Sequence, residues 1–260
     1  MTQSSENKVL VQKDGAITTV TINRHERRNA VDRETGRLLT EAFDEFDRDE
    51  AQSVAILRGT GGYFCAGFDL KSLSSAGLDY EPEGDGAMGP TRRLLSKPVI
   101  AAVEGFAVAG GLELALWCDM RVAAKTSKFG VFCRRWGVPL IDGGTIRLPR
   151  LIGHSRALDM ILTGREVDAE EAFQMGLVNR LAEEGGAYAE AVKLAEQLCA
   201  FPQTCMRVDR MTSYQQWGMD LGDALRLEGI EGEKPVLEEA KGGAARFSSG
   251  LGRGGDFSKI

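Results

Sequence analysis

The chain has 260 residues and a formal net charge of −6, and this acidic balance argues against a general role in binding nucleic acids or anionic membranes. Its hydrophobic content of 43% and charged content of 27% are ordinary for a soluble globular protein. Five cysteines without a CxxC pair predict reduced thiols and no metal site, and only two histidines are present. A polar N-terminus without long apolar runs predicts no secretion signal or membrane span, and therefore a cytoplasmic protein.

The first part of the chain predicts alternating strands and helices. Alternating apolar residues on both sides of Asp14-Gly15 predict a β-hairpin over residues 9–23. Asp32 is expected to cap a helix whose apolar residues recur on one face, and a buried strand is expected at residues 53–59. Strand, helix and strand at this spacing predict a βαβ unit.

A strand followed by a glycine-containing turn and a helix is expected twice, at residues 53–72 and 99–118. Glycine permits a tight turn and leaves backbone N–H groups exposed at a helix start. The two units can therefore direct amides at one spot from two directions. The second unit also holds Glu113 in the apolar stretch GFAVAGGLELALWCD.

A carboxyl group in such an apolar stretch can be interpreted in two ways, as a buried group or as a group that faces water. If the side chain is buried, desolvation raises its pKa, which suits a group that transfers protons near neutral pH. Exposed amide donors beside such an acid favour chemistry on a carbonyl group. The alternative is an ordinary strand, turn and core helix, with Glu113 facing water.

Five stretches, in this order along the chain, resemble the enoyl-CoA hydratase/isomerase (crotonase) family. They are Asn23–Val31, Tyr63–Leu70, Ala102–Asp119, Phe129-Gly130 followed by Gly143–Gly153, and Leu162–Val178. The resemblance implies an α/β fold, a crotonase-like spiral of ββα units, with an acyl-CoA-binding core over residues 1–195. It also implies a helical C-terminal oligomerisation region over residues 196–260.

The same resemblance implies the assembly and the ligands. Family members are commonly homotrimers or dimers of trimers that act on an acyl-CoA or enoyl-CoA thioester. No cofactor is expected to be bound permanently, because coenzyme A enters only as part of the substrate.

Carried over position by position, the resemblance implies that the backbone N–H groups of Ala66 and Gly110 form an oxyanion hole. Both would bond the thioester oxygen as it becomes enolate-like, and Glu113 would occupy the place of one of the family's two catalytic glutamates.

The ligand-binding positions follow from the same resemblance. Ala30, Phe68, Asp69 and Leu70 match positions that line the adenine and pantetheine part of the site. Asp69 is also placed to cap the short helix that follows it. The basic loop residues Arg27 and Arg28 are expected to meet the phosphates of coenzyme A, or else to form a solvated loop.

The sequence departs from the family at the second glutamate, where Cys133 stands. Asp142 is a candidate replacement, because some relatives (dienoyl-CoA isomerases and a dehalogenase) carry a catalytic aspartate there; its alternative is a helix N-cap. Cys133 is expected to line the pocket as a small apolar side chain, or to be a low-pKa thiolate beside Arg134 and Arg135. Trp136 is expected to pack over the acyl pocket.

These observations predict an enoyl-CoA hydratase/isomerase of fatty-acid or related acyl-CoA metabolism. One alternative is a double-bond isomerase that works with Glu113 alone or with Asp142. Two others are a hydrolase or dehalogenase-type relative using Asp142 or Cys133 covalently, and a catalytically impaired acyl-CoA-binding protein.

Overall fold

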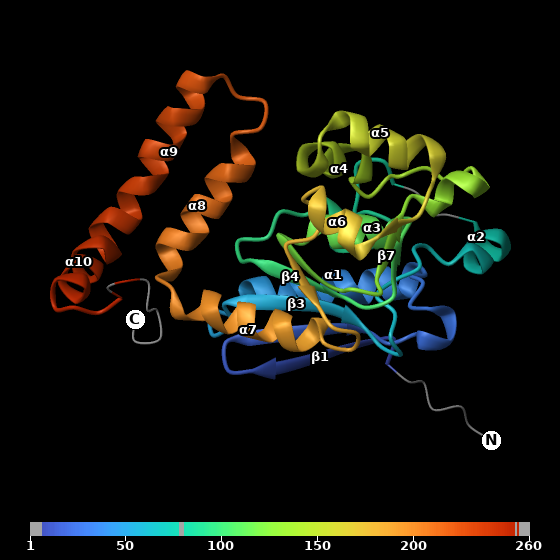
Figure 1. Cartoon of the computed structure of the whole chain (residues 1–260), viewed down its shortest axis with the longest axis horizontal. Helices are drawn as coiled ribbons and strands as arrows, with labels where there is room; N and C mark the ends of the chain where they lie inside the picture. The colour runs from blue at the N-terminus through green and yellow to red at the C-terminus, as the bar shows by residue number, and fades with distance from the viewer. Residues whose placement is uncertain (1–6, 78–80, 253, 255–260) are drawn as a thin grey trace.

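The computed structural model describes residues 7–77, 81–252 and 254, whose strands form a six-stranded and a three-stranded sheet (Figure 1). The larger sheet has the order β1-β2-β3-β4-β6-β9, and all its pairings are parallel except that of β1 with β2. Its strands are β1 (Val9–Asp14), β2 (Ile17–Ile22), β3 (Val54–Gly59), β4 (Val99–Val103), β6 (Met120–Ala124) and β9 (Arg180–Ala182). The predicted α/β class is confirmed.

Local signals correctly placed the first elements. The hairpin of β1 and β2 turns at Asp14-Gly15, where Gly15 has a φ of +55° that suits glycine. Asp32 caps helix α1 (Arg33–Arg48), because its carboxylate accepts a hydrogen bond from the Thr35 N–H at 2.9 Å.

Two apolar layers enclose the larger sheet, because successive side chains of a strand point to opposite faces. In β3, Val54 and Ile56 belong to the cluster formed with helix α7 (Ala187–Ala200). Ala55 and Leu57 belong to the cluster on the other face, which includes residues of α1 and α3 (Gly110–Trp117).

The smaller sheet lies beside α3 and has the order β5-β7-β8. It consists of β5 (Phe106–Val108), β7 (Lys128–Gly130) and β8 (Val167–Asp168). The two expected strand–turn–helix units are present: β3 leads to α2 (Leu70–Ala76), and β4 leads to α3. The second unit contains an additional strand, β5, which the sequence pattern did not indicate. All eight residues of α3 are buried.

The remaining helices cover one end of the core or extend from it (Figure 1). They are α4 (Gly144–Ile152), α5 (His154–Thr163), α6 (Ala169–Gln174), α8 (Gln203–Gln215), α9 (Leu221–Pro235) and α10 (Lys241–Ser248), with a π-helical turn at Val236–Ala240. Helices α8 and α9 lie against each other and project away from the sheets. The predicted boundary at residue 195 falls inside α7.

Asp119 attaches the projecting helices to the core. One carboxylate oxygen accepts hydrogen bonds from Arg210 Nε at 2.7 Å and from the Tyr214 hydroxyl at 2.8 Å, both on α8. The other oxygen accepts from the Val99 N–H at 2.7 Å, at the start of β4. Among the residues that the structure describes, no helix is long and apolar enough to cross a membrane.

Candidate active site

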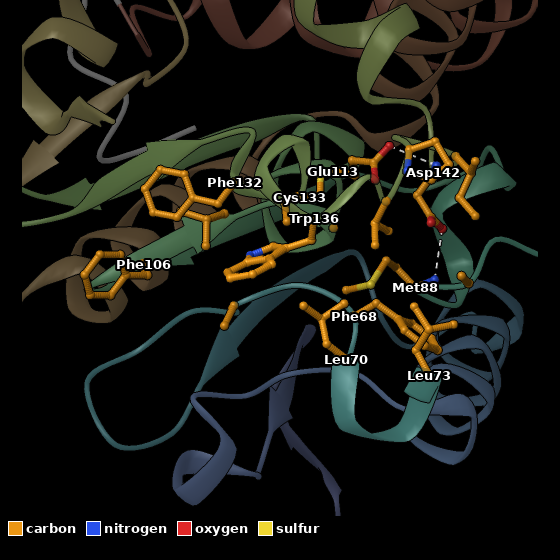
Figure 2. A pocket seen from close by; sticks show the side chains of 18 of the residues that line it. Phe68, Leu70, Leu73, Met88, Phe106, Glu113, Phe132, Cys133, Trp136 and Asp142 are labelled. Carbon is orange, nitrogen blue, oxygen red and sulfur yellow. Dashed lines mark hydrogen bonds between the residues drawn. The ribbon is translucent and has the colours of Figure 1, made fainter. Parts of the chain in front are cut away.

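A cavity of about 390 Å³ lies where α3, α2 and the loops around Met88 and Asp142 meet (Figure 2). Its lining is mostly apolar. The residues are Arg28, Ala66, Phe68, Leu70, Leu73, Ala87, Met88, Phe106, Val108, Ala109, Gly110, Glu113, Phe132, Cys133, Trp136, Val138, Pro139, Ile141 and Asp142. An apolar cavity with two carboxyl groups is the kind of place where a proton-transfer site is expected.

Gly110 presents one backbone donor to this cavity. It is the first residue of α3, where the N–H groups have no partner within the helix. The preceding Ala109 has a φ of +54°, which is strained for a residue with a Cβ atom. This turn brings the chain from β5 directly into α3, so the Gly110 N–H faces the cavity at the positive end of the helix dipole.

The prediction that the Ala66 N–H is the second donor is wrong. Its N–H already donates to the Arg28 carbonyl at 3.0 Å, so it has no proton left for a ligand. The N–H two residues later, on Phe68, makes no hydrogen bond with any described residue. Phe68 and Val31 are partners in a parallel β-bridge. In this bridge the Val31 N–H donates to the Gly67 carbonyl, and the Asp69 N–H donates to the Val31 carbonyl. The N–H of Phe68 therefore points away from Val31.

Close packing brings the Phe68 and Gly110 loops together. A Cβ atom on Gly67, whose φ is +99°, would lie 3.0 Å from the Gly110 nitrogen and 2.9 Å from the Ala109 Cβ. Only glycine permits both this conformation and this approach. The structure therefore brings the amides of Phe68 and Gly110 together beside the cavity, whereas the amide of Ala66 is already bonded to Arg28.

Glu113 lies one turn into α3 and is 2% exposed, so the reading in which it faces water is wrong. Its Oε1 accepts hydrogen bonds from the Asp142 N–H at 2.9 Å and the Gly144 N–H at 2.8 Å. Burial, and next the nearby Asp142 carboxylate, raise the pKa of Glu113 to about 8. A carboxyl group with a pKa raised in this way is suited to transferring a proton near neutral pH.

Asp142 is buried beside Glu113, and the alternative in which it caps a helix is wrong. The N-cap of α4 is Gly143, and the Asp142 carboxylate accepts no hydrogen bond from the described N–H groups of that helix. Instead, Asp142 Oδ1 accepts a hydrogen bond from the Met88 N–H at 2.9 Å (Figure 2). The same oxygen accepts a hydrogen bond from the Thr91 hydroxyl at 2.5 Å. Burial raises the pKa of Asp142, although the hydrogen bonds oppose this shift.

Each carboxyl group has one anchored oxygen and one that accepts no hydrogen bond from the described residues. Glu113 Oε1 and Asp142 Oδ1 are held, whereas Glu113 Oε2 and Asp142 Oδ2 are not. Since both side chains line the cavity, each can present its second oxygen to a ligand. Neither Met88 nor Thr91 was found from the sequence, because nothing near them in the chain marks their contact with Asp142.

Cys133 and Trp136 both line the cavity, as expected. Burial, and next the proximity of Glu113, raise the pKa of the Cys133 thiol, so the low-pKa thiolate alternative is wrong. Trp136 is 70% exposed and therefore lies at the opening of the cavity, where its ring can cover a bound ligand.

The expected ligand-binding residues divide into two groups. Arg28, Phe68 and Leu70 line the cavity, and Arg28 is exposed at its edge. Arg27 is exposed, and Ala30 is buried, but neither contributes to the lining of this cavity.

Asp69 has a structural role within the described residues. Its carboxylate caps α2 by accepting from the N–H groups of Lys71 and Ser72, as expected from its position before a helix. The other carboxylate oxygen pairs with Arg24 Nη2 at 3.1 Å. Asp69 is buried and does not line this cavity, so its expected contact with the ligand stays a prediction.

Two amide donors and a buried acid around one cavity define a site for chemistry on a carbonyl compound. A family model described as enoyl-CoA hydratase/isomerase matches residues 12–226. The chain belongs to the enoyl-CoA hydratase/isomerase family, as the five sequence stretches predicted.

The individual relatives agree with this assignment. The chain is 36% identical over 259 residues to the enoyl-CoA hydratase EchA19 of Mycobacterium tuberculosis, covering 95% of this chain and 96% of the relative. It is 37% identical over 227 residues to a probable peroxisomal enoyl-CoA hydratase 1 of Arabidopsis thaliana, covering 86% and 85%.

Solved structures confirm the predicted crotonase fold. A crystal structure of enoyl-CoA hydratase from Mycobacterium tuberculosis superposes with a TM-score of 0.88 at 39% identity, covering 94% of this chain and 96% of the other. The enoyl-CoA hydratase EchA1 from Mycobacterium marinum superposes with a TM-score of 0.87 at 38% identity and the same coverage.

Proposed function

We propose that this protein is an enoyl-CoA hydratase/isomerase that stabilises the enolate of an acyl-CoA thioester. The observation that supports the proposal is the placement of two unpaired amides, Phe68 and Gly110, with the buried Glu113 around one apolar cavity. Amides fixed in this way cost no reorganisation when negative charge develops on the thioester oxygen. Removing one such donor typically lowers kcat by about 10²–10³-fold.

Glu113 and Asp142 are proposed as the proton-transfer pair. The Cys133 thiol stays protonated and is a poor substitute for a carboxylate at that position. Asp142 supplies a second carboxyl group to the same cavity, with one oxygen anchored and one unpaired. Neighbouring carboxyl groups whose environments push their pKa values apart can act as acid and base. Burial raises the pKa of both carboxyl groups, that of Glu113 to about 8, and we assign Glu113 as the acid in the unliganded site and Asp142 as the base.

The coenzyme A part of the substrate is proposed to lie along the exposed edge of the cavity. Arg28 offers a positive charge there, on a chain whose net charge is −6. Arg27 is the exposed neighbour of Arg28 and extends the basic character of this edge. A local basic group of this kind suits the phosphates of coenzyme A.

The assembly is proposed to be a homotrimer or a dimer of trimers, built with the helices after α7. These helices expose large apolar side chains in a single chain, which favours burial against another copy. They include Leu221 at 75%, Leu225 at 58%, Ile230 at 62%, Leu237 at 73% and Phe247 at 62% exposed. We also propose a cytoplasmic location, which the reduced cysteines favour.

The experiment is a mass-spectrometric screen of 2-trans-enoyl-CoA thioesters of increasing chain length, run in parallel in H₂¹⁸O and in D₂O. Hydration adds one water and carries ¹⁸O into the product, whereas isomerisation leaves the elemental composition unchanged apart from exchanged deuterium. Either result supports the proposal. Tight binding of every thioester without conversion of any would contradict it and favour the catalytically impaired alternative.

A matched pair of variants assigns the second proton-transfer group. Asp142→Asn preserves the hydrogen-bond-accepting oxygen but removes the charge and basicity, so we expect kcat to fall by about 10²-fold or more. Glu183→Gln, at an exposed carboxylate paired with Lys125, is the control and should leave turnover unchanged. Full activity of Asp142→Asn would show that Glu113 works alone.

A further inference from the structure

The carboxylate of Asp142 is held by an element that lies far from it in the sequence. Thr91, in the short 3-10 helix η2 (Pro90–Arg92), is fully buried and donates its hydroxyl to Asp142 Oδ1 at 2.5 Å. The Met88 N–H donates to the same oxygen at 2.9 Å. Both donors engage Oδ1, so the carboxylate plane is fixed and Oδ2 is left over.

Arg147 links the backbone of Thr91 to the backbone of Asp142. Its Nη2 donates to the Thr91 carbonyl at 2.6 Å, and its Nη1 donates to the Asp142 carbonyl at 3.0 Å. The turn that carries Met88 also packs tightly against the pair. A Cβ atom on Gly86 would lie 2.1 Å from both Asp142 Oδ1 and Thr91 Oγ1. There is therefore little space for either side chain to adopt another position.

We propose that Thr91 is a positioning residue for the proton-transfer pair: its hydroxyl holds Asp142 Oδ1 and thereby directs Oδ2 toward the cavity. This inference rests on the proposed role of Asp142 in enoyl-CoA chemistry. Thr91 does not line the catalytic cavity, so it acts through Asp142 rather than on the substrate.

Charged groups from three elements face Asp142. Glu113 on α3 accepts a hydrogen bond from the Asp142 N–H. The positive charges of Arg92 on η2 and Arg147 on α4 lower the pKa of the Asp142 carboxyl group. Burial has the opposite and larger effect. The Thr91 hydroxyl favours the charged form by bonding to it. Removing that hydroxyl should therefore move the Asp142 pKa upward.

Thr91→Val is the direct test, because valine retains the shape of threonine and lacks the hydroxyl. Asp142 becomes harder to ionise, so the acidic limb of the kcat/KM profile should move to higher pH by about one unit. Thr91→Ser keeps a hydroxyl and should restore the wild-type profile. Gly86→Ala tests the same contact in a second way. Its methyl group would push the Thr91 hydroxyl and the Asp142 carboxylate apart while both residues keep their own side chains.

A double-mutant cycle separates positioning from general damage. In the Asp142→Asn background, Thr91→Val should change kcat less than twofold, because the group through which Thr91 acts has lost its charge. An equal loss of kcat in both backgrounds, with no movement of the pH limb, would overturn the inference and assign Thr91 a purely structural role.

A titration that does not depend on turnover keeps this inference separable from the proposed function. The ¹³C signal of the Asp142 carboxyl, assigned with Asp142→Asn in aspartate-labelled protein, is followed against pH in wild type, Thr91→Val and Thr91→Ser. A midpoint raised by about one pH unit in Thr91→Val alone supports the inference. An unchanged midpoint overturns it, whatever the activity. A raised midpoint in a protein that converts no thioester would support the role of Thr91 and contradict the proposed function.

Discussion

Helices α7 and α9 differ in how far their apolar residues are buried. Helix α7 presents Ala187, Ala191 and Ala195 to the larger sheet, and all three are fully buried. Helix α9 carries much larger side chains, yet Leu225 and Ile230 are 58% and 62% exposed. Helix α7 thus packs on the sheet with small residues, whereas the projecting helices carry large apolar residues that are exposed in a single chain. Catalysis and assembly are therefore expected to respond to different substitutions.

The largest expected effect lies inside the self-contained core. Glu113→Gln removes the acid–base group but keeps a side chain of the same shape that can accept the two amide hydrogen bonds. We expect kcat to fall by about 10²–10⁴-fold with the most rapidly converted thioester. The oligomeric state, measured by light scattering, should stay that of the wild type. Unchanged turnover would remove Glu113 from the mechanism.

Substitutions in the projecting helices should produce the converse result. Leu225→Asp combined with Leu237→Asp places charges on side chains that are 58% and 73% exposed in the single chain. If another copy covers them, desolvated charges disrupt the contact, and the assembly should dissociate at micromolar concentration. Sedimentation velocity measures this change. An assembly of unchanged mass would show that these residues do not contribute to the interface.

Glu113 should also make the stability of the core depend on pH. Its pKa is raised to about 8 in the folded protein from its ordinary value of 4.5, so the folded state retains a proton that the unfolded state has lost between these values. Stability from this group is therefore fully present below about pH 4.5 and is lost as the pH rises through 8. The loss is at most about 1.4 kcal/mol per pH unit.

Chemical denaturation of wild type and Glu113→Gln across this range tests the linkage. The difference in unfolding free energy between the two proteins should move in favour of the variant as the pH rises. A constant difference would mean that Glu113 is ionised in the folded protein at all these pH values.

The smallest effect is expected at the strained turn before α3. Ala109→Gly relieves the cost of a positive φ but increases the entropy of the unfolded chain, so stability should change by less than about 1 kcal/mol. Ala115→Gly, at a buried position within α3, is the matched control and should cost about 1 kcal/mol or more. Thermal unfolding of both variants compares them. Equal losses at the two positions would show that Ala109 is not strained.

Local signals in the sequence were sufficient for elements whose partners are close in the chain. The hairpin at Asp14-Gly15 and the caps by Asp32 and Asp69 each depend on groups within a few residues. Glu113 was identified because one acid in an apolar stretch has few favourable environments. The family resemblance then supplied the fold and the position of Gly110.

Contacts between distant segments were not predictable in the same way. Asp142 is held by Met88 and Thr91, which lie 54 and 51 residues away. No local pattern distinguishes that arrangement from a helix cap. The choice between the amides of Ala66 and Phe68 also depended on a bridge to Val31, since this bridge fixes which N–H points toward the cavity.

Helix α3 carries both the proposed oxyanion donor, the Gly110 N–H, and the acid Glu113, three residues apart, on a segment whose residues are all buried. The rise of an α-helix, about 1.5 Å per residue, sets the spacing of their backbones, and the N–H groups of Asp142 and Gly144 hold the Glu113 carboxyl group. A second carboxyl group can therefore come from a different loop, as Asp142 does here, without altering the spacing of this pair. Substitutions in the loop that carries Asp142 can therefore change the proton-transfer chemistry while the helix keeps the Gly110 amide and Glu113 in place.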